Sequence, residues 1–451
     1  MSDSAETTAV LNTALQEKAT SKAAWALDEA RRQGADGAEI AIHLAQGFTA
    51  SVRNGDVETI EYHRDRGVGI SVLIGDCKGN ASSTDDSEES LRDAIAAACA
   101  IARHTQPDPH AALAEPALLC REVPELDLYH PWTMPVEQAI KKSLACERAA
   151  RSDARIVNSE GASLSSSASL RLLATSNGFM GSYRSTHHSL SCAVLAQDEN
   201  GMQTGHWYDT GRRGELLASD EYIGQKAQQE AVSKLGAQIP QTGNYPIVLA
   251  PRVAASLVGH LLAAINGGAI YRRSSFLLDA LGEQVLPSWM SLSEQPLLIA
   301  GNGSSPFDQD GLPRRQQSFV DQGILSTFSL SLYAARRLAM APTGNGGGAR
   351  NIVISDSGET LQQLMDRVPS GILVTDVMGQ GVNTVTGDYS RGAGGFYFEN
   401  GEILYPVHEF TLAGQLREML ANIAGSGTDV DRRGNIMCGS LLLPDVKVAG
   451  R

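Results

Sequence analysis

The sequence predicts an α+β fold from three observations. Apolar and polar residues alternate with a period of two in several stretches, such as 38–45 and 68–74, which is typical of half-buried strands. Apolar and alanine residues recur at helical spacing in others, such as 15–32. The 45 glycines among 451 residues exceed average usage and indicate many turns and bent strands. A chain this long exceeds the usual size of a single core, so we expect several domains.

Residues 1–106 are predicted to form an N-terminal α+β domain. A first helix covers about 15–32 and ends before Gly34. The expected strands and turn that follow are 38–45, 48–53, the Asn54-Gly55 hairpin turn and 68–74. A second helix begins near Asp86 or Ser87, where Asp86 and Glu89 suit a capping box, and it runs to His104.

Three further blocks follow along the chain. Residues 107–131 are rich in proline, which continues neither a helix nor a central strand, and they are predicted to form a linker. Residues 132–240 are predicted to form a middle α+β domain, a meander with flanking helices at about 135–151 and 221–235. Its predicted turns are Asn177-Gly178 and Asn200-Gly201. Residues 241–451 are predicted to form a C-terminal β-rich domain with a few helices and a hairpin turn at Asn400-Gly401.

Charge and composition exclude some classes of partner. The net charge of -14 would repel a phosphate backbone, and no basic stripe with interleaved aromatic residues is present, so we expect no nucleic-acid binding. The start, MSDSAETTAV, lacks the features of a signal peptide, and no run reaches the ~20 apolar residues of a membrane-spanning helix. The six cysteines include no CxxC pair, which favours reduced thiols. We expect a cytoplasmic protein without membrane association.

Three short motifs carry weak signals. Residues 344–349, GNGGGA, match the spelling of a dinucleotide-binding turn but lack the preceding strand and following helix that such a turn needs, which favours a flexible loop over a cofactor site. His408-Glu409 offers the first two letters of a zincin motif without its second histidine and is more typical of a strand. His187 and His188 would point to opposite faces of a strand, and we predict surface residues in or near a hairpin.

A glycine-rich run, MGQGVNTVTGDYSRGAGG (378–395), is a candidate contact loop. Ordering so many glycines costs conformational entropy, and such runs often mark a close backbone approach to a ligand, a peptide or another chain. The residues that would make such contacts are Gly379, Gly381, Asp388, Tyr389, Ser390 and Arg391. A glycine-bent hairpin without any ligand is the alternative.

His260 stands alone in the apolar helical run VAASLVGHLLAAINGG (253–268). A catalytic zinc takes about three protein ligands plus a water, and a nearby Glu usually serves as general base. This helix carries one histidine and no carboxylate. The residue is therefore either the remaining half of a zinc-binding pair or a buried ring that binds no metal.

Several segments in one order resemble the PmbA/TldE branch of the TldD/PmbA family of peptidases. The resemblance covers essentially the whole chain, and its segments are RNGDVE, GNASSTD, RSTHHSLS, VAASLVGHLLAAINGGAIYRRSSFLLDALG, APTGNGGG, MGQGVNTVTGDYSRGAGGFYFENGEILYPV and NIMCGSLLLP. It implies that the C-terminal block corresponds to the metallopeptidase domain of the family.

The resemblance also implies a specific defect. TldD, the paralogue, carries an HExxxH helix and a downstream cysteine as zinc ligands. Matched to that helix, Ala255 and Ser256 stand in place of the first histidine and the glutamate, whereas His260 and Cys438 keep the other two ligand positions. An alanine methyl offers no lone pair and a neutral serine hydroxyl is a feeble base near pH 7, so we expect no catalytic residues and no metal in this chain.

Three hypotheses for function follow. The leading one is a non-catalytic subunit that pairs with a TldD-like zinc-bearing chain and helps it to process unfolded peptides and small protein precursors, with a homodimer left open when the partner is absent. The second is an autonomous metallopeptidase that uses His260, Cys438 and a third ligand such as His408. The third is a non-enzymatic, protein-binding modulator.

Overall fold

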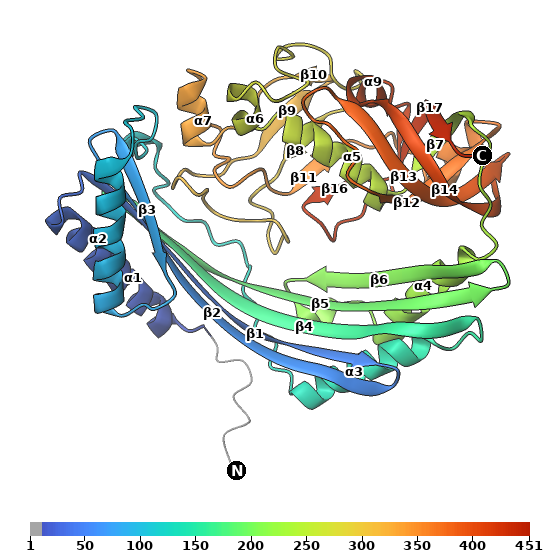
Figure 1. Ribbon diagram of the computed structural model, residues 1–451, viewed down its shortest axis with the longest axis horizontal. Coiled ribbons are helices and arrows are strands. Elements are labelled where there is room, and N and C mark those ends of the chain that lie inside the picture. The colour runs from blue at the N-terminus through green and yellow to red at the C-terminus, as the bar shows by residue number, and fades with distance from the viewer. Residues whose placement is uncertain (1–10) are drawn as a thin grey trace.

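The computed structural model describes residues 11–451 and confirms the α+β class (Figure 1). Within these residues the strands form three sheets. Residues 1–10, MSDSAETTAV, which were the stretch searched for a signal peptide, lie outside the described part. None of the described helices combines the length and the apolar character needed to cross a bilayer.

A long curved sheet forms the N-terminal half of the molecule (Figure 1). Its strand order is β3-β2-β1-β4-β5-β6, and all neighbouring pairs are antiparallel. The strands are β1 (Gly37–Arg53), β2 (Asp56–Ile74), β3 (Cys77–Ser83), β4 (Ile156–Thr175), β5 (Met180–Asp198) and β6 (Gly201–Gly211). Because β1 pairs with β4, strands on both sides of the proline-rich segment belong to one sheet.

Helices cover the convex face of this sheet (Figure 1). They are α1 (Thr13–Arg32), α2 (Glu88–His104), α3 (Val136–Ala150) and α4 (Asp220–Ser233). Alternation along β1 buries Ile40, Ile42, Phe48 and Ala50 on the helix side, in one core with α1 and α2 and a second core with α3 and α4. The other face of the sheet is left for polar residues.

Two strands are longer than the sequence predicts. β1 continues through Gln46-Gly47, where two strands were expected, because Gly47 allows a close approach: a Cβ there would lie 2.3 Å from the carbonyl oxygen of Ser166. β2 begins at Asp56, well before the predicted 68–74. Its residues 56–62 are exposed on both faces, so they show no alternation that a period-two search could detect.

The predicted start of the second helix was nearly correct, but its cap was wrong. Ser87 is the N-cap residue, and its hydroxyl accepts a hydrogen bond from the backbone N–H of Ser90 at 3.3 Å. Asp86 instead forms salt bridges with Lys22 and Arg66. These two partners lie in α1 and β2, outside the segment that a capping pattern covers. A local pattern could therefore not reveal them.

The C-terminal half contains a small closed barrel and a second small sheet (Figure 1). Pairing of β14 with β17 closes a barrel of β7 (Gly243–Leu249), β12 (Ser370–Met378), β13 (Asp388–Glu399), β14 (Glu402–Gln415) and β17 (Leu441–Ala449), and β15 (Gly425–Ser426) extends β17. The second sheet contains β8 (Leu292–Glu294), β9 (Gln317–Asp321), β10 (Ile324–Leu325), β11 (Ile352–Ile354) and β16 (Ile436–Met437). The described helices here are α5 (Pro251–Ala264), α6 (Gly267–Tyr271), α7 (Leu332–Arg337), α8 (Leu361–Asp366) and α9 (Leu416–Ala421).

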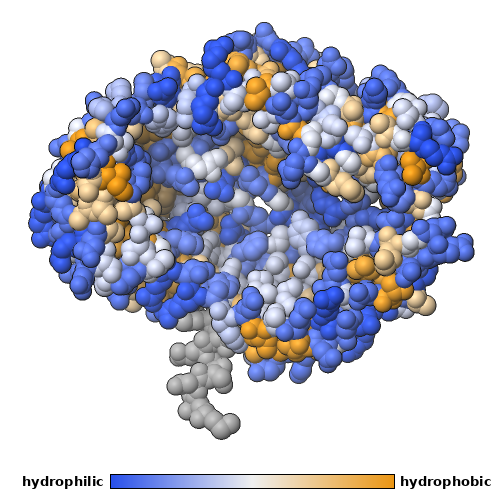
Figure 2. Space-filling model, viewed as in Figure 1, coloured by the Kyte–Doolittle hydropathy of each residue, from blue (hydrophilic) through white to orange (hydrophobic). Residues whose placement is uncertain are grey.

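The two halves contact each other at separate places. Arg212, which follows β6, donates to the carbonyl oxygens of Gly301 and Asn302. Arg336 of α7 donates to the carbonyl oxygen of Leu113 and to the carboxylate of Glu115, both in the proline-rich segment. Figure 2 shows a hollow between the curved sheet and the C-terminal half, with mainly hydrophilic residues around it.

Candidate functional site

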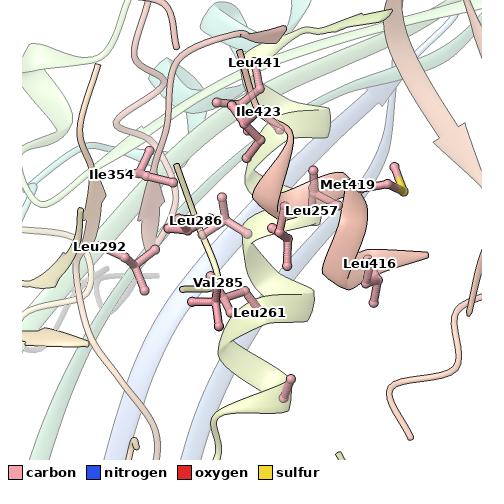
Figure 3. Close-up of a cluster of buried hydrophobic side chains, with 14 of the residues drawn as sticks. Leu257, Leu261, Val285, Leu286, Leu292, Ile354, Leu416, Met419, Ile423 and Leu441 are labelled. Carbon is pink, nitrogen blue, oxygen red and sulfur yellow. The ribbon is translucent and has the colours of Figure 1, made fainter. Parts of the chain in front are cut away.

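Helix α5 carries the positions that resemble the zinc motif. Pro251 occupies its first turn, where a missing backbone N–H costs nothing. Leu257 and Leu261 point into a large apolar cluster beside α9, as Figure 3 shows, and the helix buries further residues on the same side. These are Val253, Ala254, Val258 and Ala264. The core holds α5 in place through this apolar side, so the opposite side is fixed in position.

The opposite side of α5 is small and half-buried. Ala255, Ser256 and Gly259 lie on it at helical spacing. The start of the helix borders a cavity of about 500 Å³ whose opposite wall is formed by β6 and α4, through Trp207, Tyr208, Tyr222 and Lys234 among others. The segment that would carry the first histidine and the glutamate of a zincin therefore starts next to the space between the two halves, without offering a metal ligand there.

His260 lies against an aromatic ring and near a cation. Its ring is 6.1 Å from that of Tyr389, centroid to centroid, at an interplanar angle of 71°. Its buried Nε2 has no hydrogen-bond partner within the described residues. Burial, and to a smaller extent the positive charge of Arg391, lower the pKa of His260, so the ring is neutral at pH 7. A neutral imidazole can bind a metal, but a stable site needs further ligands from other residues.

Cys438 follows β16 and is fully buried. Its Sγ donates to the carbonyl oxygen of Gly439 at 3.1 Å. Burial, with a smaller contribution from the negative charge of Asp429, raises the pKa of the Cys438 thiol to about 12. Metal binding requires the thiolate, so a metal ion at Cys438 would have to displace the thiol proton.

The residues present do not fit a catalytic zinc. Among residues 11–451, no three His, Cys, Asp or Glu side chains come together in a group that could hold a metal ion. His408, the suggested third ligand, lies on β14, where its Nδ1 is 3.4 Å from the side-chain nitrogen of Gln203 on β6. The adjacent Glu409 has a positive φ of 53° within the strand. His408-Glu409 is thus a strand pair at a contact between the two halves.

Residues 379–387 of the glycine-rich run form a loop between β12 and β13, and residues 388–395 begin β13, against which the loop folds back. The backbone N–H of Ser390 donates to the carbonyl oxygen of Gly381 at 2.6 Å, and a Cβ on Gly381 would lie 1.9 Å from the Ser390 carbonyl oxygen. Only glycine fits there. Tyr389 is buried against His260, and Arg391 donates to the carbonyl oxygen of Met378, whereas Asp388 and Ser390 are exposed.

The structure thus brings together part of the predicted set. Tyr389 and Arg391 lie beside His260 although they are far from it in sequence. Gly379 in the loop and Asp388 and Ser390 at the start of β13 are exposed, and they remain candidates for contact with a peptide or a partner. Asp388 accepts a hydrogen bond from the side chain of Gln415, so it is partly engaged within the chain.

The GNGGGA segment encloses a buried guanidinium. Arg314 donates to the carbonyl oxygens of Gly344, Gly346 and Gly348 at 3.2, 3.1 and 3.0 Å. The segment follows α7 and precedes β11, so it lacks the strand-turn-helix context of a dinucleotide site. These hydrogen bonds hold a loop that the sequence suggested to be flexible.

A buried carboxylate next to this loop was missed by the sequence analysis. Glu294 is 1% exposed and accepts hydrogen bonds from Asn345, Gln317 and the backbone N–H of Arg350. Arg314 lies 3.6 Å from it. No local pattern marks such a residue, because its partners come from separate segments of the chain.

The prediction that His187 and His188 are both surface residues was half wrong. His187 is exposed, but His188 is 1% exposed. Its Nδ1 lies 2.9 Å from the Ser166 hydroxyl and its Nε2 lies 3.0 Å from the carbonyl oxygen of His130. The prediction that the two side chains point to opposite faces of the strand was correct. For this reason the His188 ring lies in the core and the His187 ring does not.

The concave face of the curved sheet carries a network of hydroxyl groups. Neighbouring strands bond to one another through Ser51 and Ser163 at 2.9 Å and through Ser169 and Ser185 at 2.9 Å. His187 joins this face through the Thr210 hydroxyl at 3.1 Å. In Figure 1 this face is directed toward the C-terminal half. The period-two serines of ASLSSSASL were the sequence signal for it.

Comparison with known proteins gives a consistent family. Residues 38–102, 129–235 and 242–450 match the models for domain 1, the central domain and the C-terminal domain of the PmbA/TldA metallopeptidases. Metalloprotease PmbA of Escherichia coli O157:H7 is 42% identical over 417 residues, which are 92% of this chain and 93% of that protein.

Two solved structures share the fold. A protein from Bacteroides thetaiotaomicron, described as a putative modulator of DNA gyrase, is 27% identical with a TM-score of 0.92, covering 98% of this chain and 100% of that one. TldE from Thermococcus kodakarensis, at 20% identity, has a TM-score of 0.83 and covers 95% of this chain and 100% of that one, which shows a common fold. The chain is a member of the PmbA/TldD metallopeptidase family.

Proposed function

We propose that this chain is the non-catalytic subunit of a two-chain zinc peptidase, and that a TldD-like partner supplies the metal and the chemistry. The observation that carries the proposal is the side-chain chemistry of α5. Matched to the zinc motif of the family, Ala255 and Ser256 stand where a zincin needs a histidine and a glutamate. Water activation at zinc needs a base, and none is placed on this helix.

The surroundings of the two retained positions support the same proposal. The Cys438 thiol is fully buried and donates to the carbonyl oxygen of Gly439, and His260 packs against Tyr389 in place of a second ligand. In the complex, this chain would contribute a surface for the substrate and no catalytic group. Its concave hydroxyl-bearing face offers hydrogen-bonding groups with little side-chain selectivity, which suits an extended, unfolded peptide.

The first test is zinc content together with activity. The purified chain, a TldD-like chain and their equimolar mixture are each analysed for zinc and for hydrolysis of an unfolded peptide substrate. We expect zinc in the TldD-like chain, hardly any in this chain, and a stable mixed complex with the highest activity. Zinc at one ion per chain in the isolated protein would favour an autonomous peptidase.

Variants separate the roles within the complex. His260→Ala and Cys438→Ala in this chain should leave the zinc content and the activity of the mixture unchanged, since neither residue binds metal. A matched substitution of the first motif histidine in the TldD-like chain should abolish activity. Equal activity and stability of the TldD-like chain without this chain would overturn the proposal.

A further inference from the structure

Three arginines from separate segments of the chain gather at the hollow between the two halves (Figure 2). This arginine cluster consists of Arg171 on β4, Arg212 after β6 and Arg350 after the GNGGGA segment. Burial lowers the pKa of Arg212, and the positive charges of Arg171 and Arg350 lower it further. The three guanidinium groups are therefore near enough to repel one another.

Alternation along β4 directs Arg171 toward the C-terminal half. Leu172 is buried in the core with α1 and α2, so Arg171 and Leu173 belong to the opposite, concave face. Leu173 packs in an apolar cluster with residues of the C-terminal half. Tyr183, the residue opposite Arg171 on β5, has its ring 5.5 Å from that of Phe307, centroid to centroid. Arg171 itself is exposed, so its guanidinium is free to meet a ligand in the hollow.

One turn of the C-terminal half, residues 301–303, lies beside the other two arginines. Arg212 donates hydrogen bonds to two carbonyl oxygens of this turn. Asn351, the neighbour of Arg350, accepts a hydrogen bond from a backbone N–H of the same turn at 2.9 Å. The fold thus holds Arg212 and Arg350 next to a common segment, although they are far apart in sequence.

The arginine cluster lacks an anion of its own. None of the salt bridges within residues 11–451 involves Arg171 or Arg350. The buried Nε of Arg350 also has no hydrogen-bond partner there. Arg212 donates only to carbonyl oxygens, which carry no net charge. In a chain of net charge -14, a hollow that gathers unpaired positive charge attracts ligands of the opposite sign.

We propose that the arginine cluster binds carboxylate groups of the peptide substrate, so that the hollow holds acidic unfolded peptides in preference to neutral ones. The planar fork of a guanidinium matches a carboxylate, and Arg171 and Arg350 have donors available for such a pair. The hydroxyl groups of the concave face meet the main chain of any sequence, and the arginines add a preference for charge. That the ligand is a substrate peptide rests on the proposed function.

Peptide binding to the purified chain alone tests the site without a partner. Three unfolded, labelled peptides of equal length are compared by fluorescence anisotropy. The first carries several glutamates and an amidated C-terminus, the second carries glutamines in their place, and the third is the glutamine peptide with a free C-terminus. We expect the glutamate peptide to bind about tenfold more tightly than the amidated glutamine peptide, as one charge-assisted hydrogen bond would give.

The third peptide identifies the source of the carboxylate. Weak binding of the free glutamine peptide would assign the site to acidic side chains, and tight binding would assign it to the peptide C-terminus as well. Equal binding of all three peptides, or of none, would overturn the proposal. A single-stranded oligonucleotide of equal charge that binds as tightly as the glutamate peptide would contradict a peptide site.

Variants locate the binding in the hollow. Arg171→Gln and Arg350→Gln should each weaken binding of the glutamate peptide about tenfold and leave the amidated glutamine peptide unaffected. Arg148→Gln is the matched control, because Arg148 is exposed on α3, on the convex side of the sheet, and its loss changes the net charge equally. Equal weakening by Arg148→Gln would reduce the effect to net charge and overturn the site. Unchanged melting temperatures of the variants verify folding.

Hydrolysis by the mixture with a TldD-like chain separates this inference from the proposed function. We expect a KM about tenfold lower for the glutamate peptide, and Arg350→Gln should raise that KM without changing kcat, because the contact lies away from the reacting bond. An active mixture with equal KM for both amidated peptides would overturn the charge preference and leave the proposed function standing. A mixture no more active than the TldD-like chain alone would overturn the proposed function, and binding to the isolated chain would still decide whether the arginines hold carboxylates.

Discussion

Two buried polar centres of the C-terminal half differ in how completely their groups are paired. Around Glu294, each carboxylate oxygen accepts hydrogen bonds, and Arg314 supplies the opposite charge. Around His260, the imidazole Nε2 has no partner within residues 11–451, and the neighbours are the ring of Tyr389 and the cation Arg391. The first centre has the features of a structural clamp, whereas the second leaves a buried polar atom unpaired.

The difference separates buried polar residues that stabilise the fold from those that do not. A buried charge persists when its network is satisfied, and such a network organises loops such as 344–349. A buried polar atom without a partner lowers the stability of the fold. Its presence therefore needs an explanation, such as a function. The four predictions that follow test this contrast, from the largest expected effect to the smallest.

Removing the carboxylate of the first centre should destabilise the protein most. Glu294→Ala leaves Arg314 buried without an opposite charge and removes acceptors from Asn345 and Gln317. We expect a loss of about 3–5 kcal/mol in the free energy of unfolding, measured by urea denaturation. Glu294→Gln keeps the volume and one acceptor and should lose less. Changes within about 0.5 kcal/mol for both variants would contradict the clamp.

A methyl group in the loop beside His260 should have the next largest effect. Gly381→Ala drives a Cβ against the Ser390 carbonyl oxygen and should cost about 3 kcal/mol. Gly379→Ala is the matched control: its φ of +85° is unfavourable for alanine, but nothing lies within 4 Å, so we expect about 1 kcal/mol. Thermal unfolding of both variants distinguishes a tightly packed loop from a loose one, for which the two losses would be equal.

Replacing the unpaired imidazole should stabilise the fold. His260→Leu removes a buried polar atom without a described partner and keeps an apolar side chain against Tyr389, so we expect a gain of about 1 kcal/mol. His187→Leu is the control, because its Nε2 bonds to Thr210 on an exposed face and no gain should follow. A clear loss on His260→Leu would indicate that the ring has a partner in the natural protein, such as a bound ion.

The smallest effect concerns pH. Burial lowers the pKa of His260 below 6.5, so the unfolded chain takes up this proton first as the pH falls, and stability that is present above pH 6.5 is lost below it. The advantage of His260→Leu over the natural chain should therefore grow as the pH falls from 7 to 5.5.

Other residues set the background of that experiment. The pKa values of His43, His187, His188 and His206 are also lowered, chiefly by burial, so both proteins should lose stability in acid. The difference between the two unfolding curves isolates His260. A constant difference across this pH range would mean that His260 does not titrate differently in the folded and unfolded states.

Much of the fold could be predicted because its signals are local. Helix α1 and the turns at Asn54-Gly55 and Asn400-Gly401 form where the sequence predicts them, since N-G pairs tolerate the positive φ that a tight hairpin requires. The match of Ala255 and Ser256 to zinc-motif positions stays a prediction, but its chemical consequence does not depend on the fold, because a methyl group offers zinc no lone pair in any structure.

Other features could not be predicted because they depend on partners far away in sequence. The continuity of β1 through Gly47 depends on the backbone of β4, and the capping of α2 by Ser87 leaves Asp86 to Lys22 and Arg66. The full length of β2 could not be predicted, because its residues 56–62 are exposed on both faces and show no amphipathic pattern.

By itself the sequence determined the α+β class and most of the turns, since each of these follows from propensity or patterning within a few residues. Only the tertiary structure decided that β14 and β17 close a barrel, that Tyr389 and Arg391 reach His260, and that His188 is buried. The physical reason is that burial and pairing are properties of contacts between distant segments, and no local pattern encodes which segments will meet.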